Sequence, residues 1–299
     1  MFVFIHGNFA SWRWWSPTLE RLPPGVLAVA PDLRGCGDTV IEGETAPSWS
    51  IARLADDLGE LVQALDLGRF HLVGHSLGGA VALQFALENS HKLRTLTLVS
   101  PAPAAGLAGM REGPSRSAQM LRMIDPANAA SMARLESGYR MQRALGLNRL
   151  SLRRSVAEMM PGANLEKAQM DALVDDAARM TPEALVGFLQ ALHDWNVEDK
   201  LGWMRVPTLI LAGEKDELVP PSASEKTAAL LPDAELLVWP EVGHSPQLER
   251  PDDFVVLLAA ATRRSVWGRL QSALWLLRRR LFGPRQLSAE APPSPAAGS

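Results

Sequence analysis

The segment Gly74-His75-Ser76-Leu77-Gly78 places a serine between two glycines, an arrangement that can serve covalent chemistry. A predicted strand, residues 69–73, ends directly before it, and a helix rich in glycine and alanine is predicted over residues 77–88. A strand that runs straight into a helix forces a tight, strained turn that lifts the serine oxygen above the sheet edge. The alternative is a glycine-rich turn without chemistry, and the strand-to-helix context favours a nucleophile.

A serine hydroxyl is a weak nucleophile until a base removes its proton, so Ser76 predicts a histidine nearby in space. The amide of Leu77 opens the predicted helix and lacks an intrahelical partner, so it can point at a developing oxyanion. His75 neighbours the serine in the sequence. We expect its side chain to point elsewhere on the turn and assign it no catalytic role.

The elements that must position Ser76 alternate between strand and helix. Apolar runs predict strands at residues 2–5, 26–30, 69–73, 94–99, 207–212 and 235–239. Apolar residues at helical spacing predict a helix at 51–66, and a last core helix is expected at 251–264. This alternation predicts an α/β protein with a mostly parallel central sheet and helices on both faces.

Residues 103–200 interrupt the alternation, because they contain no convincing strand and hold nine of the eleven methionines. Gly and Pro divide them into predicted helices at about 116–123, 128–145, 151–160, 165–179 and 182–193. A helical insertion between two strands of a parallel sheet is typical of a cap domain. We therefore predict a core formed by residues 1–102 and 201–264, with a helical cap at 103–200.

Five separated signatures resemble, in the same chain order, those of the α/β-hydrolase family. They are His6-Gly7, Pro31-Asp32-Leu33-Arg34-Gly35, the Ser76 pentapeptide with Gly79, the Val206–Leu209 strand leading into Gly213 and Asp216, and Gly243-His244. The resemblance covers about residues 1–102 and 201–262 and is closest in style to lid-bearing esterases and lactonases. Family members usually carry an extra hairpin and strand ahead of this point, so we expect these N-terminal strands to be missing here.

The resemblance implies a catalytic triad in the chain order serine, acid, histidine. It implies Asp216 as the acid, because Asp216 follows the predicted strand 207–212, where the family places this residue. It implies His244 as the base, in a loop after the strand 235–239. His244 would take the proton of Ser76, and Asp216 would hold the imidazole in the required tautomer.

The same resemblance implies two backbone N–H donors for the oxyanion. One is the amide of Leu77, and the other belongs to a residue just after His6-Gly7. Asn8 is the first candidate for this second donor, and Phe9 is the alternative.

We predict an apolar substrate pocket between core and cap, with Phe9, Trp12 and Met123 among the residues that line it. The preferred function is hydrolysis of a carboxylic ester or lactone of a small, largely apolar substrate through an acyl-enzyme on Ser76. Two alternatives stay open. One is hydrolysis of a carbon–carbon or amide bond by the same triad, and the other is a non-catalytic member of the fold that only binds a ligand.

The composition is that of an ordinary globular protein, with 47% hydrophobic and 21% charged residues. The formal net charge of −3 gives no strong attraction to nucleic acid, and the single cysteine, Cys36, excludes an internal disulfide. We predict neither a cofactor nor a bound metal. The chain shows no secretory signal and no run of about 20 apolar residues, so a cytoplasmic location is expected.

The C-terminal part of the chain differs from the rest in charge. Residues 262–288 contain seven arginines and no acid, and only Glu290 follows, which leaves a formal charge of −9 on residues 1–261. Residues 263–282 have the pattern of a basic amphipathic helix with two tryptophans, and we assign this helix to a segment, 265–285, outside the core. Residues 286–299 are expected to form a disordered tail. Such a helix can make weak peripheral contact with an anionic membrane, or it can pack on the core or on a second subunit; the oligomeric state stays open.

Overall fold

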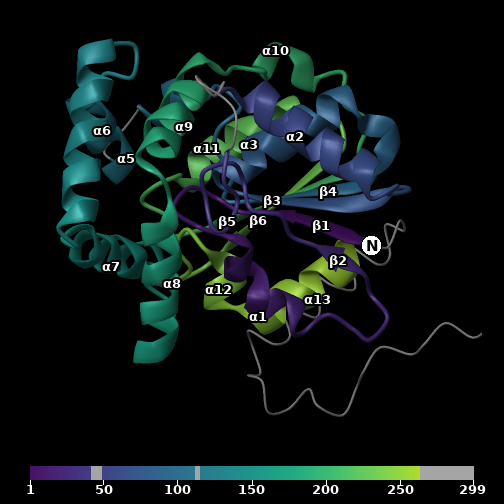
Figure 1. Ribbon diagram of the computed structural model, residues 1–299. Helices are drawn as coiled ribbons and strands as arrows, with labels where there is room; N and C mark the ends of the chain where they lie inside the picture. The colour runs from purple at the N-terminus through teal and green to yellow at the C-terminus, as the bar shows by residue number, and fades with distance from the viewer. Residues whose placement is uncertain (42–48, 112–114, 263–299) are drawn as a thin grey trace, which may run out of the picture.

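A computed structural model of the protein describes residues 1–41, 49–111 and 115–262. Its six strands form one sheet in the order β2-β1-β3-β4-β5-β6, and every neighbouring pair is parallel. Figure 1 shows helices on both faces of this sheet, so the predicted α/β class is confirmed. The strands are β1 (Phe2–Ile5), β2 (Ala28–Val29), β3 (Phe70–His75), β4 (Leu93–Val99), β5 (Thr208–Gly213) and β6 (Ala234–Trp239).

The central strands are apolar on both faces because both faces are covered by helices. Every residue of β1 and of β5 is buried. The edge strand β2 is shorter than the predicted 26–30, because only Phe2 and Val3 of β1 pair with it. The predicted basic helix and tail lie outside the described residues.

Two apolar clusters fill the spaces between the sheet and its helices. One cluster lies under α2 (Ile51–Ala64), α3 (Leu77–Glu88) and α11 (Pro221–Leu230), and includes Leu54, Leu72 and Phe85. The other contains Phe4, Trp15 and Phe254, which join the opposite face to the 3-10 helix η1 (Trp12–Trp15) and to α13 (Pro251–Ala261). The short helices α1 (Ser16–Leu19) and α12 (Pro246–Glu249) lie on this second side (Figure 1).

A helical insertion leaves the sheet after β4 and returns to it at β5, although β4 and β5 pair directly. Figure 1 shows α5 to α8 together at one side of the molecule. The helices are α4 (Leu107–Met110), α5 (Arg116–Met123), α6 (Ala129–Ala144), α7 (Asn148–Met159), α8 (Lys167–Arg179), α9 (Pro182–Asp194) and α10 (Glu198–Leu201). Of these, α9 is buried along most of its length, and its Phe188 belongs to the cluster under α2 and α3.

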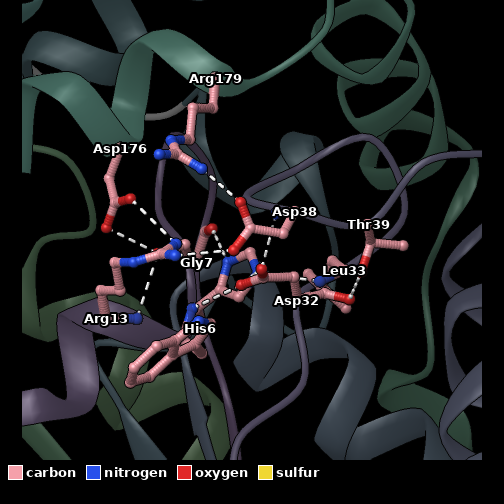
Figure 2. A network of polar contacts seen from close by, with 11 residues as sticks. His6, Gly7, Arg13, Asp32, Leu33, Asp38, Thr39, Asp176 and Arg179 are labelled. Atoms are coloured by element: carbon pink, nitrogen blue, oxygen red, sulfur yellow. Dashed lines mark hydrogen bonds and ion pairs between the residues drawn. The ribbon is translucent and has the colours of Figure 1, made fainter.

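A network of ion pairs joins α8 of the insertion to the core (Figure 2). The guanidinium of Arg13 lies 2.7 Å from an Asp38 oxygen and 3.5 Å from an Asp176 oxygen. Arg179, at the end of α8, also pairs with Asp38. The buried hydroxyl of Ser11 donates to the carboxylate of Asp176 over 2.6 Å. The contacts of Asp176 and Arg179 therefore hold one end of α8 against the loops that follow β1 and β2.

Within the described residues, no helix combines the length and the apolar character needed to cross a membrane. The same part of the chain contains no group of three or more His, Cys, Asp or Glu placed to hold a metal ion.

Candidate active site

Ser76 lies at the turn between β3 and α3, and its backbone adopts a conformation that few non-glycine residues adopt. Its φ is 53° and its ψ is −119°, and the side chain is partly exposed. Such a conformation costs of order 1–3 kcal/mol and persists only where the surroundings impose it. The predicted strained turn is thus present in the backbone.

The two glycines that flank Ser76 allow the close contacts that impose this turn. A Cβ atom on Gly74 would lie 2.3 Å from the carbonyl oxygen of Gly78. A Cβ atom on Gly78 would lie 2.4 Å from the carbonyl oxygens of both Ile5 and His6. A side chain at either position would therefore separate α3 from β3 or from β1.

Asp216 and His244 come from loops that follow the neighbouring strands β5 and β6, and their side chains meet. The Nδ1 atom of His244 lies 2.7 Å from Oδ2 of Asp216, and the two residues are 3% and 4% exposed. The other carboxylate oxygen accepts the N–H groups of Leu218 and Val219 at 2.9 and 2.8 Å. A carboxylate accepts hydrogen bonds, so Nδ1 carries the proton and Nε2 of the neutral imidazole keeps its lone pair.

The loop that carries His244 lies beside the turn that carries Ser76. Nε2 of His75 donates a hydrogen bond to the backbone carbonyl of His244 over 2.9 Å, and the two rings are 5.0 Å apart between centroids. Among the described residues, no hydrogen bond joins the side chains of Ser76 and His244. Catalytic hydrogen bonds are often loose without substrate.

The loop after β1 approaches Ser76 from the other side. A Cβ atom on Gly7 would lie 2.9 Å from Cβ of Ser76. Nε2 of His6 accepts the N–H of Leu33 at 2.9 Å, so Nδ1 carries the proton and donates to the Gly7 carbonyl over 2.7 Å. Burial lowers the pKa of His6, which favours this neutral form.

The hydrogen bond to the Gly7 carbonyl fixes the peptide group whose N–H belongs to Asn8. The N–H of Phe9 donates to the Asn8 side chain at 3.2 Å, whereas the N–H of Asn8 makes no hydrogen bond among the described residues. At the start of α3, the N–H of Leu77 has no partner within its helix. The N–H groups of Asn8 and Leu77 are thus two backbone donors near Ser76 that make no hydrogen bond outside their elements among the described residues.

The comparison with protein families matches residues 1–251 to the family described as alpha/beta hydrolase fold. The chain belongs to the alpha/beta hydrolase family. It is an enzyme, a serine hydrolase of this fold.

Relatives of known name agree with this assignment. The pimeloyl-[acyl-carrier protein] methyl ester esterase of Aromatoleum aromaticum is 30% identical over 87% of this chain and 97% of that protein. The 2-hydroxy-6-oxo-6-phenylhexa-2,4-dienoate hydrolase of Burkholderia cepacia is 26% identical over 84% of each chain. The fold matches an esterase from Exiguobacterium antarcticum with a TM-score of 0.70 at 20% identity, over 87% of this chain and 91% of the other.

In this alpha/beta hydrolase the residues predicted for the substrate pocket have three different environments. Phe9 is half-buried, and its ring meets Tyr139 of α6 edge-on with 6.0 Å between centroids, so it lies between core and insertion. Trp12 is also half-buried, and the Arg13 guanidinium lies over its ring, 5.0 Å from the ring centroid. Met123 is 87% exposed at the end of α5, so the prediction that it lines a covered pocket is wrong. Helical periodicity could place Met123 on a helix but not choose the face that meets the core.

Two residues of this hydrolase contact the His244 loop although neither was assigned a role from the sequence. His75 points at that loop, so its nearness to Ser76 was a usable signal. The second is Glu249, whose carboxylate accepts the N–H groups of Gly243 and Ser245 on either side of His244. No motif pointed to Glu249.

Proposed function

We propose that this chain hydrolyses a carboxylic ester or lactone of a small, largely apolar substrate through an acyl-enzyme on Ser76. The observation that carries the proposal is the buried Asp216–His244 pair, 2.7 Å apart, beside a serine in a strained turn. The pair supports this role because it leaves the Nε2 atom of His244 with a free lone pair. In that tautomer the imidazole can act as a general base.

In the proposed reaction, Oγ of Ser76 attacks the carbonyl carbon while Nε2 of His244 takes the hydroxyl proton. The oxyanion of the tetrahedral intermediate accepts the N–H groups of Leu77 and Asn8. The bond to the leaving oxygen then breaks, and His244 returns the proton to it. Water, activated by the same imidazole, cleaves the acyl-serine, which releases the acid and restores Ser76.

One feature supports an ester as the bond that is cleaved, and a second supports an apolar substrate. One relative with 30% identity is named a methyl ester esterase. The side chain of Phe9 packs against apolar residues of both the core and the insertion, so an acyl chain near the loop after β1 would meet apolar surface.

A second candidate is cleavage of a carbon–carbon bond, and one relative favours it. That relative is named a hydrolase of 2-hydroxy-6-oxo-6-phenylhexa-2,4-dienoate, a substrate whose name contains no ester. The same nucleophile, base and oxyanion donors would serve both reactions. The substrate therefore decides between them.

The test is a panel of p-nitrophenyl esters, lactones, anilides and a dienoate of this kind, assayed with the wild type and with Ser76→Ala. We expect turnover of esters or lactones that Ser76→Ala lowers by about 10⁶-fold in kcat, as in comparable triads. Ser90→Ala, which alters an exposed serine in the short 3-10 helix that follows α3, is the matched control and should be unchanged. Near-native ester hydrolysis by Ser76→Ala would refute the proposal, and turnover of the dienoate alone would favour the second candidate.

A further inference from the structure

The loop that carries His244 is held through its backbone by three separate parts of the molecule. The N–H of His244 donates to the carbonyl of Met159 in α7 over 2.7 Å. The carbonyl of His244 accepts from Nε2 of His75, as described above. The N–H groups of the two flanking residues, Gly243 and Ser245, donate to the carboxylate of Glu249. The N–H and carbonyl groups of His244, and the N–H groups of its two neighbours, thus have partners outside the loop or at its far end.

The Glu249 carboxylate also reaches into the insertion. Its Oε2 atom accepts the N–H of Gly162 at 2.9 Å, and its two oxygens accept the N–H of Gly243 at 2.9 and 3.0 Å. The N–H of Ser245 lies 3.3 Å from Oε1. One carboxylate therefore joins the turn after α7 to both sides of His244.

The two segments also touch directly, which leaves little freedom at this junction. A Cβ atom on Gly162 would lie 2.8 Å from the Glu241 carbonyl and 2.9 Å from Oε2 of Glu249. A Cβ atom on Gly243 would lie 2.4 Å from Cδ of Pro161 and 2.5 Å from the carbonyl of Met159. A shift of the turn 160–163 must therefore move either the His244 loop or the Glu249 side chain.

The charge of Glu249 is balanced by these amides rather than by a cation. No arginine or lysine pairs with it among the described residues. Burial raises the pKa of this carboxyl and the nearby Asp216 raises it further, whereas the three amides act in the opposite direction. A carboxylate accepting several N–H groups makes hydrogen bonds about twice as strong as neutral ones. A half-buried acid beside a second acid is unfavourable unless it makes such bonds, so packing alone does not account for glutamate at this position.

We propose that Glu249 is a positioning residue that couples the seating of the insertion to the orientation of His244. The role of His244 as a base rests on the proposed function. The coupling between the insertion and the His244 loop rests on geometry alone. A correctly seated turn 160–163 would hold the carboxylate between Gly162 and Gly243, and the carboxylate would fix the loop from which the imidazole projects. Displacement of the turn would release the loop and misalign Nε2.

The first test compares Glu249→Ala and Glu249→Gln with the wild type. The concentration of active sites is measured by titration with a fluorophosphonate, and kcat is expressed per site that this reagent labels. Misplacement of a catalytic group by about 1 Å can cost about 10²-fold, so we expect kcat of Glu249→Ala to fall by about 10- to 100-fold with little change in KM. Glu249→Gln keeps one acceptor oxygen and should fall less. Glu241→Gln is the matched control, because its exposed side chain pairs only with Lys215 at 3.6 Å among the described residues.

The second test perturbs the junction from the insertion while the carboxylate stays in place. Gly162→Ala should lower kcat per labelled site in the same direction as Glu249→Ala. Hydrogen exchange of the peptide that contains residues 241–249 should rise in both variants. If the variants lose folded protein but keep wild-type kcat per labelled site and wild-type exchange in this loop, Glu249 is only structural and the proposal is overturned.

These readouts separate the two proposals. Failure of the wild type to react at Ser76 would refute the proposed function, yet the exchange measurement would still decide whether Glu249 couples the insertion to the loop. Normal labelling at Ser76 with no effect of Glu249→Gln, Glu249→Ala or Gly162→Ala would refute the coupling alone.

Discussion

The insertion meets the core at two junctions built from different contacts. At the first, four charged side chains form ion pairs, and most of them are partly exposed: Arg13, Asp38, Asp176 and Arg179 (Figure 2). At the second, Glu249 and the carbonyl of Met159 bind backbone N–H groups in the loop that carries His244. No contact of the first junction involves the His244 loop, whereas the contacts of the second hold that loop directly. We therefore expect charge changes at the first to alter stability and binding, and changes at the second to alter the chemical step.

The largest loss of kcat is expected when His244 is no longer oriented by Asp216. Asp216→Asn replaces the acceptor at Nδ1 by a group that can donate, so it favours the tautomer in which Nε2 carries the proton and cannot act as a base. Kinetics on the best ester of the panel should show kcat lower by about 10⁴-fold, the loss seen when a triad aspartate is replaced in this way. Asp66→Asn, at an exposed position after α2, is the control. A loss under about tenfold would mean that Asp216 does not orient the base.

The first junction should contribute to stability more than to chemistry. Asp176→Ala leaves the buried Ser11 hydroxyl without its acceptor and removes one partner of Arg13. An unsatisfied buried polar group costs about 1–3 kcal/mol, and we expect urea unfolding to show a loss in this range. The value of kcat per labelled site should stay within about twofold, because no contact of Asp176 reaches His244.

Asp175→Ala is the matched control for this experiment. The neighbouring Asp175 is exposed and pairs with Arg149 inside the insertion, so its loss leaves the junction intact. A tenfold fall in kcat for Asp176→Ala with unchanged KM would show that the ion-pair junction controls the chemical step as well.

As the pH falls, titration in the core should lower the stability of the protein before the ion pairs of the first junction are lost. Burial lowers the pKa of His75 to about 3, so the folded protein binds fewer protons than the unfolded chain between about pH 6.5 and about pH 3. Stability from this group is therefore present above pH 6.5 and is lost as the pH falls, by about 1.4 kcal/mol per pH unit. By contrast, Arg13 lowers the pKa of Asp38, so that carboxylate stays charged through mild acid.

His75→Gln removes this titration and should flatten the pH dependence of the free energy of unfolding between about pH 6 and about pH 4.5. The readout is the slope, measured by urea unfolding at several pH values, and not the absolute stability, which the lost hydrogen bond to His244 also changes. An unchanged slope would show that His75 is not the neutral, buried group that its environment indicates.

The smallest expected effect concerns the exposed pairs of the first junction. Asp38 contacts both Arg13 and Arg179 near the surface, where water and salt screen charges. Asp38→Asn should lower the melting temperature slightly at low salt, and the difference should disappear at about 0.5 M NaCl. A difference that persists at high salt would show that this junction is better shielded from solvent than its exposure indicates.

The sequence predicted the parts of the site that depend on local order along the chain. The turn at Ser76 could be recognised because a strand, five residues and a helix define it. Asp216 and His244 could be placed because each follows a strand, and parallel neighbouring strands end at the same edge. Their separation of 2.7 Å needed the structure, because it depends on the packing of two loops.

The parts that the sequence did not predict depend on contacts between distant segments. Glu249 binds Gly162 across 87 positions, and no composition or spacing indicates such a contact. The extent of β2 depends on pairing with Phe2 and Val3 rather than on its own apolar run. Met123 was misplaced because an apolar residue on a cap helix can face either the core or the solvent, and its surroundings decide which.

Rapid quench with peptide mass spectrometry can show whether a covalent acyl intermediate forms on Ser76. The wild type is mixed with a p-nitrophenyl ester from the panel, quenched in acid within the first turnover, and digested. We expect one equivalent of p-nitrophenol per active site and an added acyl mass on the peptide that contains Ser76, absent from Ser76→Ala. Turnover without an adduct at Ser76, or an adduct on another residue that disappears on further turnover, would refute an acyl-enzyme on Ser76.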